Sequence, residues 1–263
     1  MSAFSSSKAR SRGSTIAYWV ATLLVALEMA LGGVWDLLRI SYVLSVIEHL
    51  GYPTYFLFII GAWKIPCAIA LLAPRFPRLK EWAYMGAIFN YTGAVASHLS
   101  VGDGAGKCVG PLVYAALTLF SWVLRPADRR ELNNSTLFFH ANVNYWITTA
   151  ILATECLVGV MGALRLQPFL GIIEHLGYPA YFMTILGVWY VLAGVALLAP
   201  RFPSLKEWAY AGLIFNYTGA AASHLAAGDN IATLVAPSIF IVLVAASWAT
   251  RPPYRRPLIE REC

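Results

Sequence analysis

Charged residues are scarce in this sequence. Only 12% of its 263 residues are Asp, Glu, Lys or Arg, whereas 59% are hydrophobic. Soluble domains carry about 25% charged and about 45–50% apolar residues, so the composition excludes an ordinary soluble domain. The net charge is +6, but the charges gather at the ends of apolar segments. This distribution favours a membrane topology over a nucleic-acid-binding surface.

Motifs that would indicate a resident cofactor are also missing. The four cysteines form no Cys-x-x-Cys pair, and three of them lie inside apolar runs. They suit small packing residues better than a disulfide framework or a zinc site. The sequence has no nucleotide-binding glycine loop, haem motif, flavin fingerprint or nucleophile elbow. No cofactor is therefore evident, and any redox cofactor would come from a partner protein.

What the sequence does have is an internal repeat. Glu48-His-Leu-Gly-Tyr-Pro53 returns as Glu174-His-Leu-Gly-Tyr-Pro179, and the run 79–84 returns at 205–210. More than half of the aligned positions between 48–126 and 174–252 are identical. Before this block the register shifts by one residue, so that Glu28 aligns with Glu155. Similarity at a fixed period over this length indicates a gene duplication.

Each repeat contains four apolar segments of close to the ~20 residues that cross a bilayer as a helix. We expect spans near 16–38, 55–73, 82–101 and 108–124, and again near 144–166, 180–199, 208–226 and 231–249. Four crossings return the chain to its starting side, so the two repeats must be parallel. The predicted fold is an all-α integral membrane protein of eight transmembrane helices, arranged as two parallel tandem four-helix bundles over 16–126 and 144–252.

Basic residues decide the orientation of these spans. If the chain starts in the cytoplasm, most Lys and Arg residues lie on that side, and only Arg39, Lys107 and Arg165 fall outside. Such an excess is the normal cytoplasmic signature. The basic start resembles a signal peptide, but the apolar run that follows carries Glu28 and recurs in the second half. We therefore expect both termini in the cytoplasm, with a tail over 1–15, a linker over 127–143 and a tail over 253–263.

Three motifs of the repeats are specific. They are His49-Leu-Gly-Tyr-Pro53, the run Pro-Arg-Phe-Pro-x-Leu-Lys-Glu-Trp-Ala-Tyr, and Gly93-Ala-x-x-Ser97-His98-Leu99-x-x-Gly102-Asp103. Together they resemble the DoxX-like family of small four-helix bacterial membrane proteins. The resemblance covers both repeats and implies a four-helix bundle in each, in the bacterial cytoplasmic (inner) membrane. Relatives include a membrane subunit of a thiosulfate–quinone oxidoreductase and proteins tied to redox stress, which implies a quinone as a candidate ligand.

Polar residues inside the spans are the candidate site, because burying them in lipid is costly. Glu28, Lys64 and Asn90 are expected at one depth on three helices, with Glu28 and Lys64 as an ion pair. The corresponding residues of the second repeat are Glu155, Tyr190 and Asn216. Because Tyr190 replaces the lysine and Ala163 stands opposite Asp36, the second repeat is expected to be the degenerate copy.

A second polar layer is expected toward the outer face. In the first repeat it comprises Asp36, His49, His98 and Asp103, and in the second His175, His224 and Asp229. The residue types would allow a metal, but no compact ligand spacing such as His-Glu-x-x-His occurs, so no metal site is predicted. We expect His98 and His224 to donate hydrogen bonds that hold the outer loops to the bundles.

Three functions remain open on the sequence alone. The first is a membrane component of a redox or electron-transfer system that binds a lipophilic, quinone-like molecule at the Glu28–Lys64–Asn90 layer, served by a redox partner protein. The second is a non-catalytic scaffold that anchors a partner, and the third is a small-solute or proton transporter. Beyond the lipid bilayer, a homo-oligomer is compatible with the sequence, and nucleic acid is not an expected partner. A cavity beside the polar layer, and where it opens, would separate these functions.

Overall fold

The computed structural model describes residues 12–126, 129, 142–199 and 202–252, and within these ranges all regular structure is helical. Most of the predicted linker over 127–143, the predicted tail over 253–263 and residues 1–11 of the predicted tail over 1–15 lie outside the described residues. The first repeat consists of α1 (Arg12–Leu38), α2 (Ser41–His49), α3 (Phe56–Leu72), α4 (Pro77–Ser100) and α5 (Ala105–Val123).

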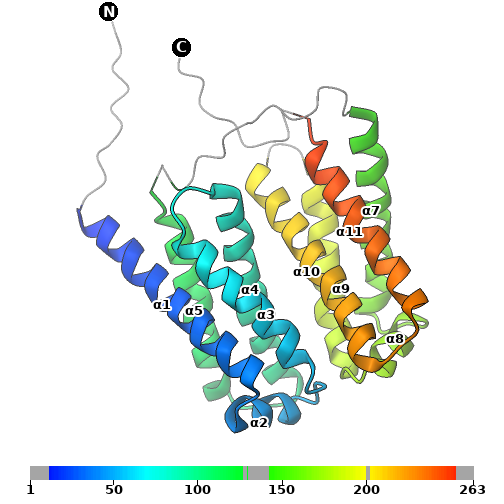
Figure 1. Cartoon of the computed structure of the whole chain (residues 1–263), viewed down its shortest axis with the longest axis horizontal. Helices are drawn as coiled ribbons and strands as arrows, with labels where there is room; N and C mark the ends of the chain where they lie inside the picture. The colour runs from blue at the N-terminus through cyan, green and yellow to red at the C-terminus, as the bar shows by residue number, and fades with distance from the viewer. Residues whose placement is uncertain (1–11, 127–128, 130–141, 200–201, 253–263) are drawn as a thin grey trace, which may run out of the picture.

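The second repeat has the same order of elements. It consists of α7 (Asn142–Ala163), α8 (Phe169–His175), α9 (Ala180–Leu198), α10 (Pro203–Ala227), a short 3₁₀ helix η1 (Ile231–Leu234) and α11 (Val235–Ala249). Figure 1 shows the two sets of helices as neighbouring bundles, with α4 and α10 facing each other across the boundary. Each of the eight predicted segments contains one long helix.

The boundaries differ from the prediction at the starts of α4 and α10. Both helices begin about five residues earlier than predicted, at Pro77 and Pro203. Proline is well tolerated in the first turn of a helix, where its missing N–H has no partner to lose. The short helices α2 and α8 lie within segments for which no helix was predicted. Each packs apolar residues such as Ile47 and Ile173 between the two repeats.

Five helical segments are long and apolar enough to cross a membrane. They are Arg12–Leu38, Ala105–Val123, Val143–Ala163, Ala180–Leu198 and Ile231–Ala249. α3 is apolar but shorter, at 17 residues. Large hydrophobic side chains are exposed on these helices, as Ile16, Val20 and Leu23 are on α1. Such an exterior suits lipid rather than water.

The two bundles meet through contacts that occur twice, once from the first repeat to the second and once from the second to the first. The Phe215 ring lies against Gly86, and the Phe89 ring lies against Gly212, where a Cβ atom would come within 3.1 Å and 2.7 Å of the rings. Each phenylalanine also meets a tryptophan of the other repeat, in the pairs Trp63–Phe215 at 4.7 Å and Phe89–Trp189 at 4.4 Å between ring centroids. The boundary therefore has approximate twofold symmetry.

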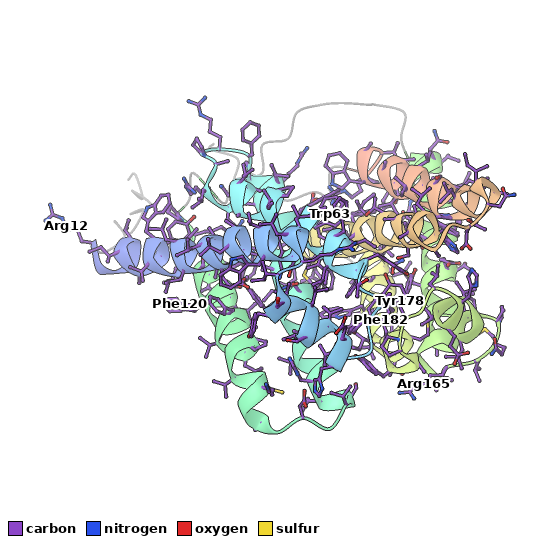
Figure 2. The ribbon with its side chains drawn as sticks, turned by 60° about the horizontal axis from the view of Figure 1, so that its bottom comes forward. Arg12, Trp63, Phe120, Arg165, Tyr178 and Phe182 are labelled. Carbon is purple, nitrogen blue, oxygen red and sulfur yellow. The ribbon has the colours of Figure 1, made fainter. Side chains whose placement is uncertain are left out.

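Hydrogen bonds join both ends of this boundary. At the α2/α8 end, Tyr55 donates to the Leu176 carbonyl and Tyr181 donates to the Leu50 carbonyl, each at 2.6 Å. Tyr178 and Phe182 pack with these tyrosines in one hydrophobic cluster, and Figure 2 shows both residues beside the first repeat.

The opposite end of the boundary lies at the starts of α4 and α10. There Trp82 donates to Glu207 at 2.9 Å and Trp208 donates to Glu81 at 2.8 Å. The middle of the boundary thus lies between two polar clamps, which we call the tyrosine clamp and the tryptophan clamp.

Candidate functional site

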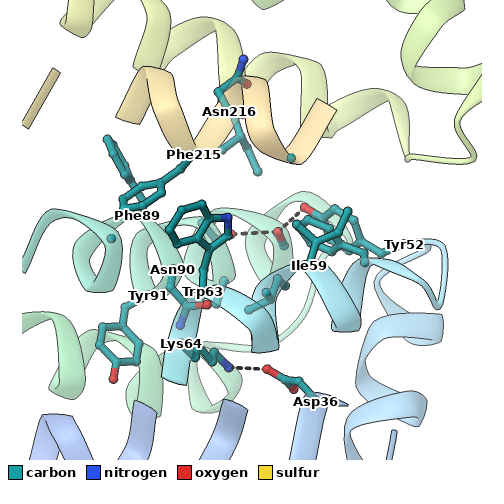
Figure 3. Close-up of a pocket in the computed structure, with 18 of the residues that line it drawn as sticks. Asp36, Tyr52, Ile59, Trp63, Lys64, Phe89, Asn90, Tyr91, Phe215 and Asn216 are labelled. Atoms are coloured by element: carbon teal, nitrogen blue, oxygen red, sulfur yellow. Dashed lines mark hydrogen bonds and ion pairs between the residues drawn. The ribbon is translucent and has the colours of Figure 1, made fainter. Parts of the chain in front are cut away.

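A cavity of about 1020 Å³ extends along the inner faces of both repeats. Its walls come mainly from α1, α3 and α4 of the first repeat and from α9 and α10 of the second. Most of the lining is aliphatic or aromatic. Figure 3 shows Trp63 between the polar residues of the first repeat and the facing Phe215 and Asn216. A concave, mostly apolar space with a few polar groups is the usual form of a small-molecule site.

The predicted polar layer lines this cavity, but its ion pair differs from the prediction. Lys64 Nζ lies 2.8 Å from Asp36 Oδ2, and Glu28 is not its ion-pair partner (Figure 3). The side chains are 14% and 6% exposed. The reason is the close approach of α1 and α3, where a Cβ on Gly61 would lie 2.8 Å from the Gly33 carbonyl oxygen and 3.1 Å from Asp36 Cβ. This contact sets Asp36 beside the next turn of α3, which carries Lys64.

Glu28 has a different partner, one that the sequence analysis missed. Its Oε2 accepts a hydrogen bond from the Tyr91 hydroxyl. Tyr91 is only 3% exposed and stacks on Tyr114 with 5.5 Å between ring centroids. The sequence signal was present, because tyrosine follows the layer's asparagine in both copies, as Tyr91 and as Tyr217.

Asn90 lies on α4 and lines the same cavity. Among the described residues, its side-chain amide forms no hydrogen bond. The three residues predicted for this layer therefore line one cavity, but no hydrogen bond or ion pair joins them to one another. Their polar atoms instead face a shared open space.

The second repeat keeps the layer in an altered form. Asn216 Nδ2 donates to the Tyr190 hydroxyl at 2.6 Å. Glu155 lines the cavity and has neither an ion pair nor a hydrogen bond within the described part of the chain. A Cβ on Gly159 would lie 2.6 Å from Tyr190 Cβ. Tyr190 therefore packs directly onto the glycine that corresponds to Gly32.

The outer layer forms a compact hydrogen-bonded group in each repeat. Asp103 accepts from His49 Nε2 at 2.8 Å and from His98 Nδ1 at 2.6 Å. Asp229 is bonded in the same way by His175 and His224, at 2.8 and 2.6 Å. These contacts tie the loop after α4 and α10 to the end of α2 and α8. The hydrogen bonds from His98 and His49 hold the pKa of Asp103 below its ordinary value.

This outer group has no arrangement suited to a metal. Across the described ranges, no three His, Cys, Asp or Glu side chains converge as metal ligands do. The two histidines of each group point at the carboxylate between them rather than at a common empty centre.

A buried polar cluster at the tryptophan clamp was also missed. Glu81 accepts from Arg125 at 2.5 Å and from Trp122 at 2.9 Å, in addition to Trp208 of the other repeat. Lys80 is fully buried and donates to carbonyls at the end of α3, including Ala70 at 2.8 Å. The Lys-Glu-Trp and Trp-x-x-Arg runs occur in both repeats, which could have indicated this cluster. The basic residues in them were instead assigned to the cytoplasmic ends of the spans.

Comparison with known proteins supports the resemblance noted in the sequence. The DoxX-like family matches residues 20–121 and again residues 147–247. Neither the curated proteins nor the solved structures give a match. The two matched ranges coincide with the two helical bundles and together cover most of the chain. This chain is therefore a membrane protein of the DoxX-like family and carries that family's domain twice in tandem.

Proposed function

We propose that the protein binds a lipophilic, quinone-like molecule in the cavity between its repeats, as a membrane component of a redox system. The observation that carries this proposal is that the Asp36–Lys64 pair borders a cavity of about 1020 Å³. A pair that only joined two helices would be enclosed and fully hydrogen-bonded, since a buried ion pair offsets its desolvation cost only when its remaining polar groups are satisfied.

The walls of the cavity support a ligand that arrives from lipid. Leu27, Leu31 and Trp35 on α1 line the cavity and remain 56%, 47% and 43% exposed, so the cavity is open beside α1. The entrance they border would lie within the apolar belt. The tyrosine and tryptophan clamps bind the repeats together at either end. This arrangement supports lateral entry of an apolar molecule over transport of a water-soluble solute.

The proposed topology follows the sequence. The eight long helices form eight crossings in two parallel bundles over 16–126 and 144–252, with both termini on the cytoplasmic side of a bacterial inner membrane. The basic residues at the span ends support this orientation. Electrons would reach the bound molecule from a partner protein, because the chain carries no recognisable motif for a redox cofactor.

Mass spectrometry of co-purified lipophiles tests the proposal. The variant Lys64→Tyr places the second repeat's own residue into the first repeat, where it should fill the space beside Gly32 as Tyr190 does beside Gly159. We expect an apolar molecule to co-purify with the wild type and to be depleted at least about tenfold in Lys64→Tyr. The control Tyr190→Phe changes only a hydroxyl in the second repeat and should retain it. Equal amounts in Lys64→Tyr and in the wild type, or no enriched molecule, would favour a non-catalytic scaffold.

A further inference from the structure

Several polar atoms of the first repeat face the cavity without partners. Lys64 is bound, among the described residues, only by Asp36, which leaves two of its three N–H groups available. Glu28 Oε2 accepts from Tyr91, and no described residue donates to its Oε1. The amide of Asn90 likewise has no partner in the part of the chain that the structure describes. All three residues are half-buried and line the cavity, so these polar atoms are available to bind a molecule that enters it.

Glu28 and Lys64 lie side by side at one wall of the cavity. A Cβ on Gly32 would lie 3.1 Å from Glu28 Oε1 and 3.5 Å from Lys64 Nζ, so both atoms approach the same face of α1. We call the part of the cavity wall around Gly32, with Glu28, Lys64 and Asn90, the Gly32 pocket. In the second repeat, where Glu155 also has no partner among the described residues, the Tyr190 side chain covers the equivalent glycine.

The charges of the Gly32 pocket limit what can fill it. Glu28 and Asp36 together carry one more negative charge than Lys64 neutralises when all three are ionised. A ligand with its own negative charge would be repelled at short range in a medium of low dielectric constant. A lipid phosphate or a fatty-acid carboxylate is therefore a poor match, and a neutral polar group is favoured.

The hydrogen-bonding pattern is equally restrictive. Glu28 Oε1 needs a donor, whereas the free N–H groups of Lys64 need an acceptor. A hydroxyl group does both. The aromatic side chains along the cavity, including the exposed Trp35 and Trp63, offer flat surfaces for a ring.

We infer that the Gly32 pocket takes a neutral hydroxy-aromatic molecule, a phenol or the reduced, hydroxylated form of a quinone, whose hydroxyl donates to Glu28 Oε1 and accepts from Lys64 or Asn90. The inference rests on the proposed function and narrows the ligand class. It also assigns one such site to each chain, because Tyr190 occupies the equivalent space in the second repeat.

Three probes with the same apolar tail test this inference on the full chain in detergent or nanodiscs. 4-Decylphenol has the hydroxyl, 4-decylanisole has the same oxygen without its hydrogen, and 4-decylbenzoate carries a negative charge. By calorimetry we expect the phenol to bind at least about tenfold more tightly than either of the others, because loss of a donor leaves a charged acceptor unpaired. The expected stoichiometry is one phenol per chain.

The matched variants are Glu28→Gln and Glu48→Gln, the second at an exposed carboxylate of α2 that does not line the cavity. Glu28→Gln removes the charge of the acceptor and should reduce the preference for phenol over anisole to about threefold or less. Glu48→Gln should leave the preference unchanged. Equal loss of preference in both variants would overturn the assignment of Glu28 as the acceptor.

The probe series also separates failure of this inference from failure of the proposed function. If phenol and anisole bind equally to the wild type, or if the benzoate binds most tightly, the inferred ligand class is wrong while the lipophilic site stands. If none of the three probes binds, both proposals fail. These wild-type outcomes require no variant to fold.

Discussion

Trp82 of the first repeat donates its indole N–H to the Glu207 carboxylate of the second repeat, at 2.9 Å. The bond has a counterpart of the same kind in the opposite direction, from Trp208 to Glu81 at 2.8 Å. Both carboxylates are also paired with an arginine of their own repeat, at 2.5 Å. Each carboxylate of the tryptophan clamp therefore holds together helices of its own bundle and also binds the other bundle.

Loss of the two exchanged bonds should destabilise the protein. In the double variant Trp82→Phe/Trp208→Phe, each buried carboxylate loses one donor, at a cost of about 1–3 kcal/mol per bond. We expect a fall of several degrees in the thermal unfolding temperature in detergent. Trp35→Phe, a change at an exposed tryptophan, is the control and should unfold close to the wild type. An unfolding temperature equal to that of the control would show that the clamp adds no stability.

The Asp36–Lys64 pair should behave as a coupled unit. Lys64→Met leaves Asp36 buried without its cation, which typically costs about 3–5 kcal/mol. The double variant Asp36→Leu/Lys64→Met removes both charges and should recover most of that loss. Thermal unfolding of both variants and of Asp36→Leu gives the coupling energy as a double-mutant cycle. Additive losses would contradict the pairing of these two residues.

The outer loop of the first repeat should loosen in acid. Hydrogen bonds from two histidines lower the pKa of Asp103 from its ordinary value of 3.8. The folded loop therefore holds a proton on Asp103 more weakly than the unfolded chain does. The resulting stability is fully present above pH 3.8 and is lost as the pH falls through the lower, folded-state pKa. Hydrogen exchange at residues 101–104 should rise over that interval.

Asp103→Asn is the control for this pH dependence. It removes the titrating group, so exchange at the same residues should be fast at pH 6 and should change little on further acidification. A wild-type loop whose exchange rises instead between pH 7 and pH 5 would place the responsible group elsewhere.

The second repeat offers a gain-of-function test. Replacing Tyr190 by Lys and Ala163 by Asp restores the two residues that distinguish the first repeat at this depth. Removing the tyrosine ring should uncover the face of Gly159 and create a second pocket. The number of 4-decylphenol molecules bound per chain should rise from one to two. A value that stays at one would mean that other differences between the repeats close the second copy.

The sequence predicted the helices and the duplication well, because apolar length and a long repeat are properties of the chain alone. It predicted the wrong partner for Lys64, because depth along a helix does not define which side chain it meets. Glu28 and Asp36 lie two turns apart on one face of α1, and only the close contact between Gly33 and Gly61 decides between them. That contact depends on how α1 and α3 pack together, and the sequence of neither helix alone indicates which residues of the other it meets.

The missed residues have a similar explanation. Arg125 and Lys80 were assigned to the cytoplasmic ends of spans, where basic side chains are expected in any membrane protein. Their burial at 3% and 0% exposure shows a packing role that the topology rule does not address. The helices α2 and α8 were missed because short amphipathic segments beside a Gly-Tyr-Pro turn resemble ordinary loops.

The exchanged clamps also constrain how the two copies can diverge. A change at Glu207 affects a tryptophan of the opposite half, so each copy's ends are tied to the other's sequence. Among the residues that the structure describes, the polar contacts of Lys64 and Tyr190 stay within their own bundle, with Asp36 and Asn216. In the fused chain, the residues between the two clamps can therefore change in one repeat without a matching change in the other.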